Sequence, residues 1–114
     1  MALLQKNRLT KKKDFDLVYK KGNAVKGNFL FIKTKLNDLG VCRAGFIIPN
    51  KVINKAVNRN GIKRLFSETF RLYMSKENKG HDIIVVITRK ADKEILGSDL
   101  DKLLDQMLHE NLYH

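Results

Sequence analysis

The sequence predicts an α+β fold, a two-layer sandwich in which three helices accompany a mixed sheet of about four strands. Apolar residues recur at helical spacing in three segments, and runs rich in β-branched and aromatic residues lie between them. The resulting order is helix, strands, helix, strand, helix. A chain of 114 residues is long enough for one hydrophobic core, so we expect a single domain over residues 1–114.

The first helix is expected after Thr10. Phe15, Val18 and Tyr19 recur at helical spacing, and Gly22 follows a basic last turn, which is a common way for a helix to end. This segment is therefore expected to be a short amphipathic helix.

Residues 28–48 predict two strands on either side of the turn sequence LNDLG. By alternation, Phe29, Phe31 and Lys33 fall on one face of the first strand, with apolar residues on the other. Residues 24–26 are expected as a short edge strand. Both faces of the sheet carry apolar side chains, so both should be covered.

The second half of the chain predicts a helix, a strand and a helix. The first of these is expected to run from a cap at Asn54 or Asn58 to about Lys76. The run HDIIVVITR predicts a central strand that is covered on both sides. Ser98, with Asp101 three residues later, resembles a capping box and is expected to open the last helix.

The charge of the chain indicates a polyanionic partner. Lys and Arg total 23 against 12 Asp and Glu, a net charge of +11, which favours nucleic acid. The hydrophobic content of 43% separates the chain from disordered basic tails. Cys42 is the only cysteine, so no internal disulfide can form, and a small buried side chain on a strand is expected there. No apolar run approaches a membrane span, and we expect a cytoplasmic protein without a membrane partner.

The expected second helix has a narrow sector of polar and basic residues. At about 100° per residue, this sector contains Asn60, Lys63, Arg64, Ser67 and Arg71. An ordinary solvated face is the alternative interpretation. Because the sector holds like charges and no acid, binding of an RNA or DNA backbone is favoured.

A second patch combines aromatic rings with lysines. Phe15 and Tyr19 lie one turn apart among lysines on the first helix, and Phe29, Phe31 and Lys33 share a strand face. If the helix packs beside the sheet, these groups line a groove of the kind that holds single-stranded nucleic acid. The alternative is that the aromatic rings simply belong to the core.

These segments together resemble a known family. The stretch NKAVNRNGIKRLFSETFR, preceded by RAGFIIPNKV and opened by LTKKKDFDLVYKKG, is similar to the protein component of bacterial ribonuclease P. That ribonucleoprotein removes the 5′ leader from precursor tRNA. The resemblance runs from Arg8 to the last helix. Its most specific part matches the family's Arg-Asn-Arg motif and comprises Arg59, Asn60, Ile62, Lys63 and Arg64.

The resemblance implies a left-handed βαβ crossover, the hand that general topology rules disfavour. It implies contacts to the catalytic RNA from Lys51, Lys55, Arg59, Asn60, Lys63, Arg64 and Arg71. It implies a cleft for the leader of precursor tRNA, lined by Lys12, Lys13, Phe15, Tyr19, Phe29, Phe31 and Lys33. The partners are then the catalytic RNA and precursor tRNA, with no obligate protein partner.

In this family the RNA subunit performs the hydrolysis, and Mg²⁺ is expected for the holoenzyme. Consistent with this, the sequence offers no catalytic residue and no metal-binding motif, because no nucleophile with a neighbouring base, carboxylate pair or His/Cys cluster occurs at usable spacing. His81, His109 and His114 are expected to be surface or terminal residues.

The sequence departs from the family pattern at three places. Gly61 replaces the second Arg of the motif, residues 47–51 read IIPNK where the family has a more polar and basic stretch, and Lys33 takes a cleft position that is often aromatic. Two other functions compete with the resemblance: a ribosomal or ribosome-assembly RNA-binding protein, because small basic α+β domains are common there, and a nuclease that acts without RNA.

Overall fold

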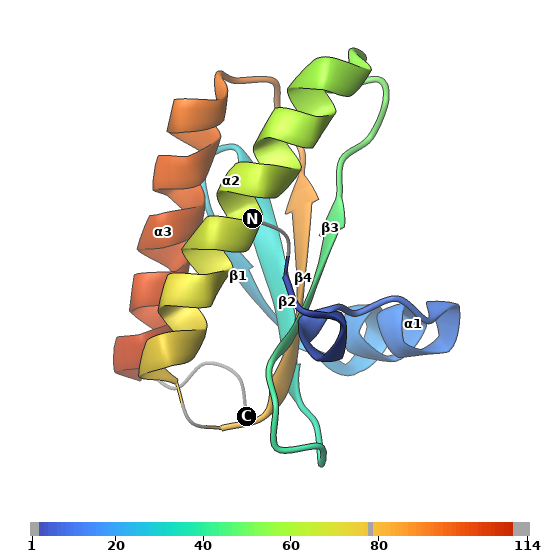
Figure 1. The fold of residues 1–114 in the computed structure, drawn as a ribbon, viewed down its shortest axis with the longest axis vertical. Coiled ribbons are helices and arrows are strands. Elements are labelled where there is room, and N and C mark those ends of the chain that lie inside the picture. Colours follow the sequence, from blue (N-terminus) through green and yellow to red (C-terminus); the bar gives the residue numbers. More distant parts are fainter. Residues whose placement is uncertain (1–2, 78, 111–114) are drawn as a thin grey trace.

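The computed structural model describes residues 3–77 and 79–110. After a short 3₁₀ turn, Gln5–Asn7, the elements are α1 (Lys12–Lys21), β1 (Asn23–Lys26), β2 (Leu30–Leu36), β3 (Arg43–Ile47), α2 (Ala56–Lys76), β4 (His81–Ile87) and α3 (Lys93–Glu110) (Figure 1). The expected class and element order are confirmed, including the edge strand β1. None of the described helices is long and apolar enough to cross a membrane.

The four strands form one mixed sheet in the order β1-β2-β4-β3. β1 and β4 both pair antiparallel with β2, whereas β3 and β4 are parallel. β2 and β3 follow each other in the chain but do not pair, because β4 lies between them. Every residue of β4 is buried, which confirms it as the central strand.

The connection from β3 through α2 to β4 is left-handed. In Figure 1, β3 lies to the right of β4, both strands run upward, and α2 crosses in front of the sheet. The chain therefore moves leftward over the near face, opposite to nearly all such connections. The hand implied by the family resemblance is confirmed.

Helices cover both faces of the sheet and create two apolar clusters. α2 and α3 pack over the face that carries Ile83 and Val85, where the larger cluster lies. α1 packs across the opposite face, where Val18 contacts the cluster around Ile84 and Val86. The sheet and the α2/α3 pair thus form two layers, and α1 lies on the other face of the sheet (Figure 1).

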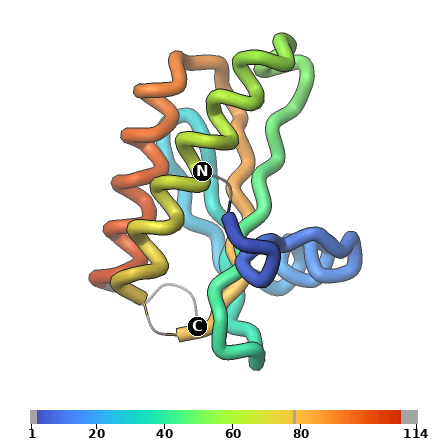
Figure 2. The backbone as a smooth tube through the Cα atoms, in the orientation of Figure 1, coloured from blue at the N-terminus to red at the C-terminus, as the bar shows by residue number. Residues whose placement is uncertain are grey.

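The N-terminal segment runs along the outer strand β3 (Figure 2). Leu3 belongs to the α2/α3 cluster and Leu9 to the α1 cluster, so the segment passes from one face to the other. The Leu9 N–H donates to the Ala44 carbonyl at 3.0 Å. This contact shields part of a strand edge that would otherwise be open to pairing with another chain.

Asp99, on α3, fixes the chain just before β2. Its carboxylate accepts hydrogen bonds from the Asn28 N–H at 3.2 Å and the Phe29 N–H at 2.9 Å. A Cβ on Gly27 would lie 2.6 Å from a carboxylate oxygen of Asp99, so this close approach requires glycine.

This contact turns Phe29 away from the face expected for it. Phe29 packs against the α2/α3 cluster, and the Arg89 guanidinium lies over its ring at 5.2 Å. Phe31, by contrast, packs in the α1 cluster. The prediction that Phe29 shares a face with Phe31 and Lys33 is therefore wrong, because β2 begins only at Leu30 and the alternation does not extend before it.

Both predicted helix caps are also wrong. α2 begins after Lys55, which makes no side-chain cap hydrogen bond, and Asn58 lies inside the helix. α3 begins five residues before Ser98, and the Leu96 N–H donates to the Asp92 carbonyl at 3.0 Å. Leu96 is fully buried in the α2/α3 cluster, so packing extends this helix toward its N-terminus.

His81, which was expected at the surface, is fully buried. Its Nδ1 lies 2.8 Å from the Lys79 carbonyl and 3.4 Å from the Cys42 sulfur, and its Nε2 lies 2.6 Å from the Tyr73 hydroxyl. A carbonyl can only accept, so Nδ1 donates to it and the neutral ring accepts from Tyr73 at Nε2. Burial lowers the pKa of His81 and raises the pKa of Cys42 to about 11. Cys42 is buried as expected, and His114 lies outside the described residues.

Acid should destabilise the fold through His81. Because its folded pKa is lowered from 6.5, the unfolded chain binds more protons between that lowered pKa and 6.5. The stability contributed by the neutral ring is fully present above pH 6.5. As the pH falls below 6.5, the free energy of unfolding decreases by at most about 1.4 kcal/mol per pH unit. Urea unfolding at about pH 7.5 and about pH 5.5 should show a shallower pH dependence for His81→Gln than for the wild type. Equal pH dependence in the two proteins would contradict this role.

Candidate nucleic-acid interface

The α2 helix presents a basic surface because its opposite side is held in the core. Ile62 and Phe66 are buried in the α2/α3 cluster, and this orientation leaves Asn60, Lys63, Arg64 and Arg71 exposed. Ser67 was expected in the same exposed sector but is only 7% exposed. Its hydroxyl donates to the Lys63 carbonyl at 2.8 Å, which satisfies the group without solvent.

Arg59 has a different environment from the other cations. Its guanidinium donates to the carbonyls of Ile48 and Ile53, the latter at 3.3 Å, in the loop between β3 and α2. The same loop is closed by hydrogen bonds from the Val52 and Ile53 N–H groups to the Pro49 carbonyl, both at 3.0 Å. Arg59 thus holds the loop that displays two other predicted contacts, the exposed Lys51 and Lys55.

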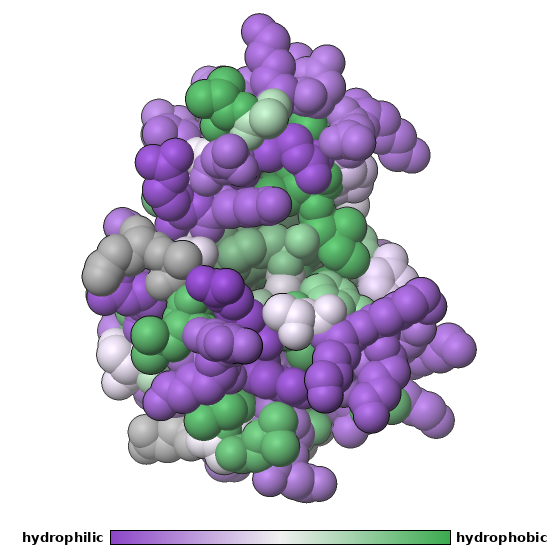
Figure 3. Space-filling model, turned by 45° about the vertical axis from the view of Figure 1, so that its right-hand side comes forward, coloured by the Kyte–Doolittle hydropathy of each residue, from purple (hydrophilic) through white to green (hydrophobic). Residues whose placement is uncertain are grey.

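A second group of predicted residues meets between α1 and the sheet. The rings of Tyr19 and Phe31 form an edge contact with centroids 6.3 Å apart, and the Lys33 ammonium lies 5.4 Å from the centre of the Tyr19 ring. Tyr19 remains 45% exposed. Seen from the β3 side, the surface also has a recessed apolar area between the hydrophilic upper part of the molecule and hydrophilic side chains at the lower right (Figure 3).

Phe15 reaches β3 only because residue 45 is glycine. A Cβ on Gly45 would overlap the tip of the Phe15 ring. The structure therefore brings Phe15, Tyr19, Phe31 and Lys33 to the same face of the sheet and leaves Phe29 on the other face. Sequence reasoning did not identify Gly45, although a glycine inside a strand is a known sign of close approach.

The two predicted lysines of α1 are exposed at the start of that helix. Lys12 pairs with Asp16 at 3.0 Å, and both side chains are largely in solvent. An exposed pair of this kind contributes little to stability, so the ammonium can exchange Asp16 for a phosphate at little cost. Lys13 is exposed as well.

Sequence reasoning also missed the ion pair that joins α1 to the sheet. Arg43 donates to both carboxylate oxygens of Asp82, at 2.8 and 2.7 Å, and to Asp14 of α1 at 3.4 Å. Asn37 donates to Asp82 at 2.7 Å, so that carboxylate has three donors. The hydrogen bond to Asp82 raises the pKa of Arg43. The sequence did offer an indication, because Arg43 begins one largely apolar strand and Asp82 is the second residue of another.

Comparisons with known proteins agree with this geometry. A family model described as Ribonuclease P matches residues 3–109. The Ribonuclease P protein component of Fusobacterium nucleatum is 43% identical over 104 residues, covering 89% of this chain and 93% of that protein. The corresponding protein of Caldanaerobacter subterraneus is 38% identical over 100 residues, covering 85% of each chain.

Solved structures agree as well. A mutant of the Staphylococcus aureus RNase P protein superposes with a TM-score of 0.79 at 28% identity, covering 90% of this chain and 88% of that one. The Thermotoga maritima RNase P protein gives a TM-score of 0.76 at 29% identity, covering 87% and 98%. These matches do not favour a ribosomal or ribosome-assembly function. The chain belongs to the ribonuclease P protein family and is the protein component of an endoribonuclease that works with the RNase P RNA in tRNA 5′ maturation.

Proposed function

We propose that this protein binds the catalytic RNA through α2 and the loop before it, and binds the 5′ leader of precursor tRNA beside α1, at the group formed by Phe15, Tyr19, Phe31 and Lys33. The observation that carries this proposal is the placement of two differently built cationic surfaces, one on the α2 helix and one beside α1 on the opposite face. In this arrangement the RNA subunit carries out the hydrolysis, and no obligate protein partner is required. We place the particle in the cytoplasm.

The α2 surface suits an RNA backbone. The Arg64 guanidinium can contact two phosphate oxygens at once, whereas the Lys63 ammonium acts as a point charge. The Asn60 amide can donate to a phosphate and accept from a 2′-hydroxyl. All three side chains are exposed on one side of a helix that its buried side holds in place.

The group of rings and Lys33 beside α1 suits a single strand without a fixed sequence. Every base has a π face that can stack on a ring such as Tyr19 or Phe31, and stacking of this kind tolerates any sequence. Lys33, beside the Tyr19 ring, supplies charge for the leader's phosphates. Charge takes the place of a third ring there, so leader binding should depend strongly on salt.

One observation supports placing the chemistry outside the protein. The cluster that most resembles an acid–base site, Tyr73 with His81 and Cys42, is buried in the core and out of reach of RNA. We assign Mg²⁺ to the holoenzyme and derive no step through a metal on this chain.

The direct test is to add the purified protein to its cognate catalytic RNA. At low Mg²⁺, where the RNA alone is slow, the protein should increase cleavage of precursor tRNA at the 5′ end. Absence of stimulation at every Mg²⁺ and salt concentration would contradict the proposal. Cleavage by repurified protein that contains no RNA would instead point to an independent nuclease.

Arg64→Ala should weaken binding to the catalytic RNA in a salt-dependent manner. Loss of one phosphate contact lowers the slope of log affinity against log salt concentration by about one unit. Lys76→Ala is the matched control, because Lys76 is an exposed cation at the far end of the same helix. Equal slopes for the two variants would exclude Arg64 from the interface.

Arg59→Lys should weaken RNA binding even though the charge is kept, because one ammonium cannot replace the guanidinium on both loop carbonyls. The N–H groups of Val52 and Ile53 should lose protection from hydrogen exchange as the loop loosens. In a double-mutant cycle, Lys51→Ala should have a smaller effect in the Arg59→Lys background than in the wild type. Full affinity of Arg59→Lys with unchanged exchange would show that Arg59 serves only as a charge.

Tyr19→Ala should weaken precursor tRNA binding to the holoenzyme by about 1–3 kcal/mol, the usual range for a lost stacking contact. Binding of mature tRNA, which lacks the leader, and of the catalytic RNA should change little. Phe15→Ala should show the same selectivity for precursor tRNA. Leu17→Ala is the control, because Leu17 is an exposed apolar residue of α1 outside this ring group. Equal losses for precursor and mature tRNA would contradict a leader site here.

A further inference from the structure

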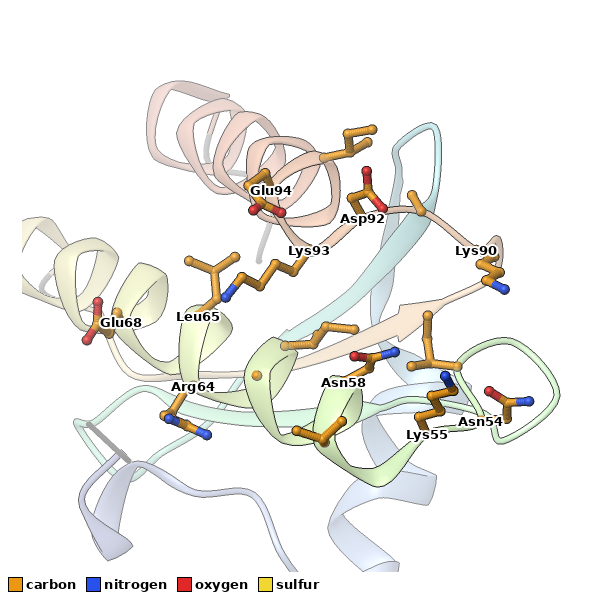
Figure 4. A pocket seen from close by; sticks show the side chains of 16 residues that line it. Asn54, Lys55, Asn58, Arg64, Leu65, Glu68, Lys90, Asp92, Lys93 and Glu94 are labelled. Atoms are coloured by element: carbon orange, nitrogen blue, oxygen red, sulfur yellow. The ribbon is translucent and has the colours of Figure 1, made fainter.

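A groove of about 970 Å³ separates the N-terminal half of α2 from the segment that leads into α3 (Figure 4). Gly61, Arg64 and Leu65 lie on its α2 side, and Lys90 and Lys93 lie on the other. Arg64 belongs both to this groove and to the α2 surface assigned to the catalytic RNA. The groove is therefore a direct continuation of that surface.

Gly61 is not required by any contact within the protein. It is the sixth residue of α2, and a Cβ built on it meets no atom within 4 Å. Leu65, one turn later, packs against Gly97 of α3. Residues four apart share a helix face, so a side chain at position 61 would project toward α3 and into the groove. Glycine in a helix costs up to about 1 kcal/mol relative to alanine, and no contact of the folded chain offsets that cost here.

The opposite wall brings cations to this open position. Figure 4 shows the Lys93 side chain extending across the groove toward Leu65. Within the described part of the chain, neither Lys90 nor Lys93 makes a side-chain hydrogen bond or ion pair. Both are exposed, so their charges remain available to a ligand.

The other charges of the groove limit what it can hold. Its lining contains four cations, Lys55, Arg64, Lys90 and Lys93, and three acids, Glu68, Asp92 and Glu94. Glu68 lies at one end, and the other two acids lie on the α3 side (Figure 4). A long polyanion would meet these acids, whereas a short backbone segment can place one phosphate at Lys93 and continue past α2 toward Arg64, whose side chain points away from Lys93 (Figure 4). Apolar side chains of both walls, including Val57 and Ile95, can contact its riboses.

We propose that this groove holds a short phosphodiester segment of the catalytic RNA, and that Lys93 contacts the phosphate that a cation at position 61 would otherwise bind. The inference rests on the proposed binding of the catalytic RNA by α2. It adds a second wall to that surface and explains Gly61, because an arginine there would place a second positive charge beside Lys93.

The experiment measures affinity for the cognate catalytic RNA in four proteins: wild type, Lys93→Ala, Gly61→Arg and the double variant. Lys93→Ala should weaken binding by about tenfold and lower the salt slope by about one unit. Gly61→Arg alone should change affinity by less than about twofold, because the phosphate is already bound. In the Lys93→Ala background, Gly61→Arg should restore most of the lost affinity for the catalytic RNA. Thermal unfolding should show that all four proteins fold.

Other outcomes overturn the inference. If Lys93→Ala behaves like the Lys76→Ala control, the groove does not bind the RNA. If Gly61→Arg changes affinity by the same factor in both backgrounds, in either direction, the two positions do not share a phosphate. Lys63→Ala, measured in parallel, distinguishes failure of the groove from failure of the α2 surface. If Lys63→Ala loses affinity for the catalytic RNA but Lys93→Ala does not, only the groove is rejected. If neither variant loses affinity, α2 is rejected as the RNA-binding surface.

Discussion

The burial of β4 on both faces is the constraint on which the rest of the structure depends. All seven of its residues are buried, and it pairs with β2 on one side and β3 on the other. An apolar strand in the middle of a sheet requires a cover on each face, and the chain supplies α2 and α3 on one face and α1 on the other. The same requirement separates the two candidate RNA surfaces, because each lies on a helix that covers a different face.

Packing of one side of α2 gathers its cations on the exposed side. Ile62, Phe66 and Phe70 are buried and fix the rotation of the helix about its axis, so the polar sector faces away from the core. Arg59 extends this order to the preceding loop by binding two of its carbonyls. For the proposed contact between α2 and RNA, preorganisation of this kind lowers the entropy that must be lost on binding.

On the other face, α1 is held by polar contacts as well as by packing. The Arg43–Asp82 pair reaches Asp14 of α1, one residue before Phe15, and Gly45 leaves the space that the Phe15 ring occupies. An ion pair of this kind stabilises a fold only modestly, because desolvation opposes the attraction. Its contact with Asp14 ties the start of α1 to the sheet, next to the Phe15 ring.

The sequence by itself determined the element order, the rotation of α2 and the basic surface that it presents, because these follow from periodicity within a few turns of chain. Of the five residues that the sequence predicted to meet beside α1, four do so: Phe15, Tyr19, Phe31 and Lys33. Only the tertiary structure decided the position of Phe29, which depends on Asp99, 70 residues away. It likewise decided the burial of His81, the start of α3 and the insertion of β4 between β2 and β3. Each of these is set by partners distant in the chain, and local periodicity carries no information about which distant partner a residue will meet.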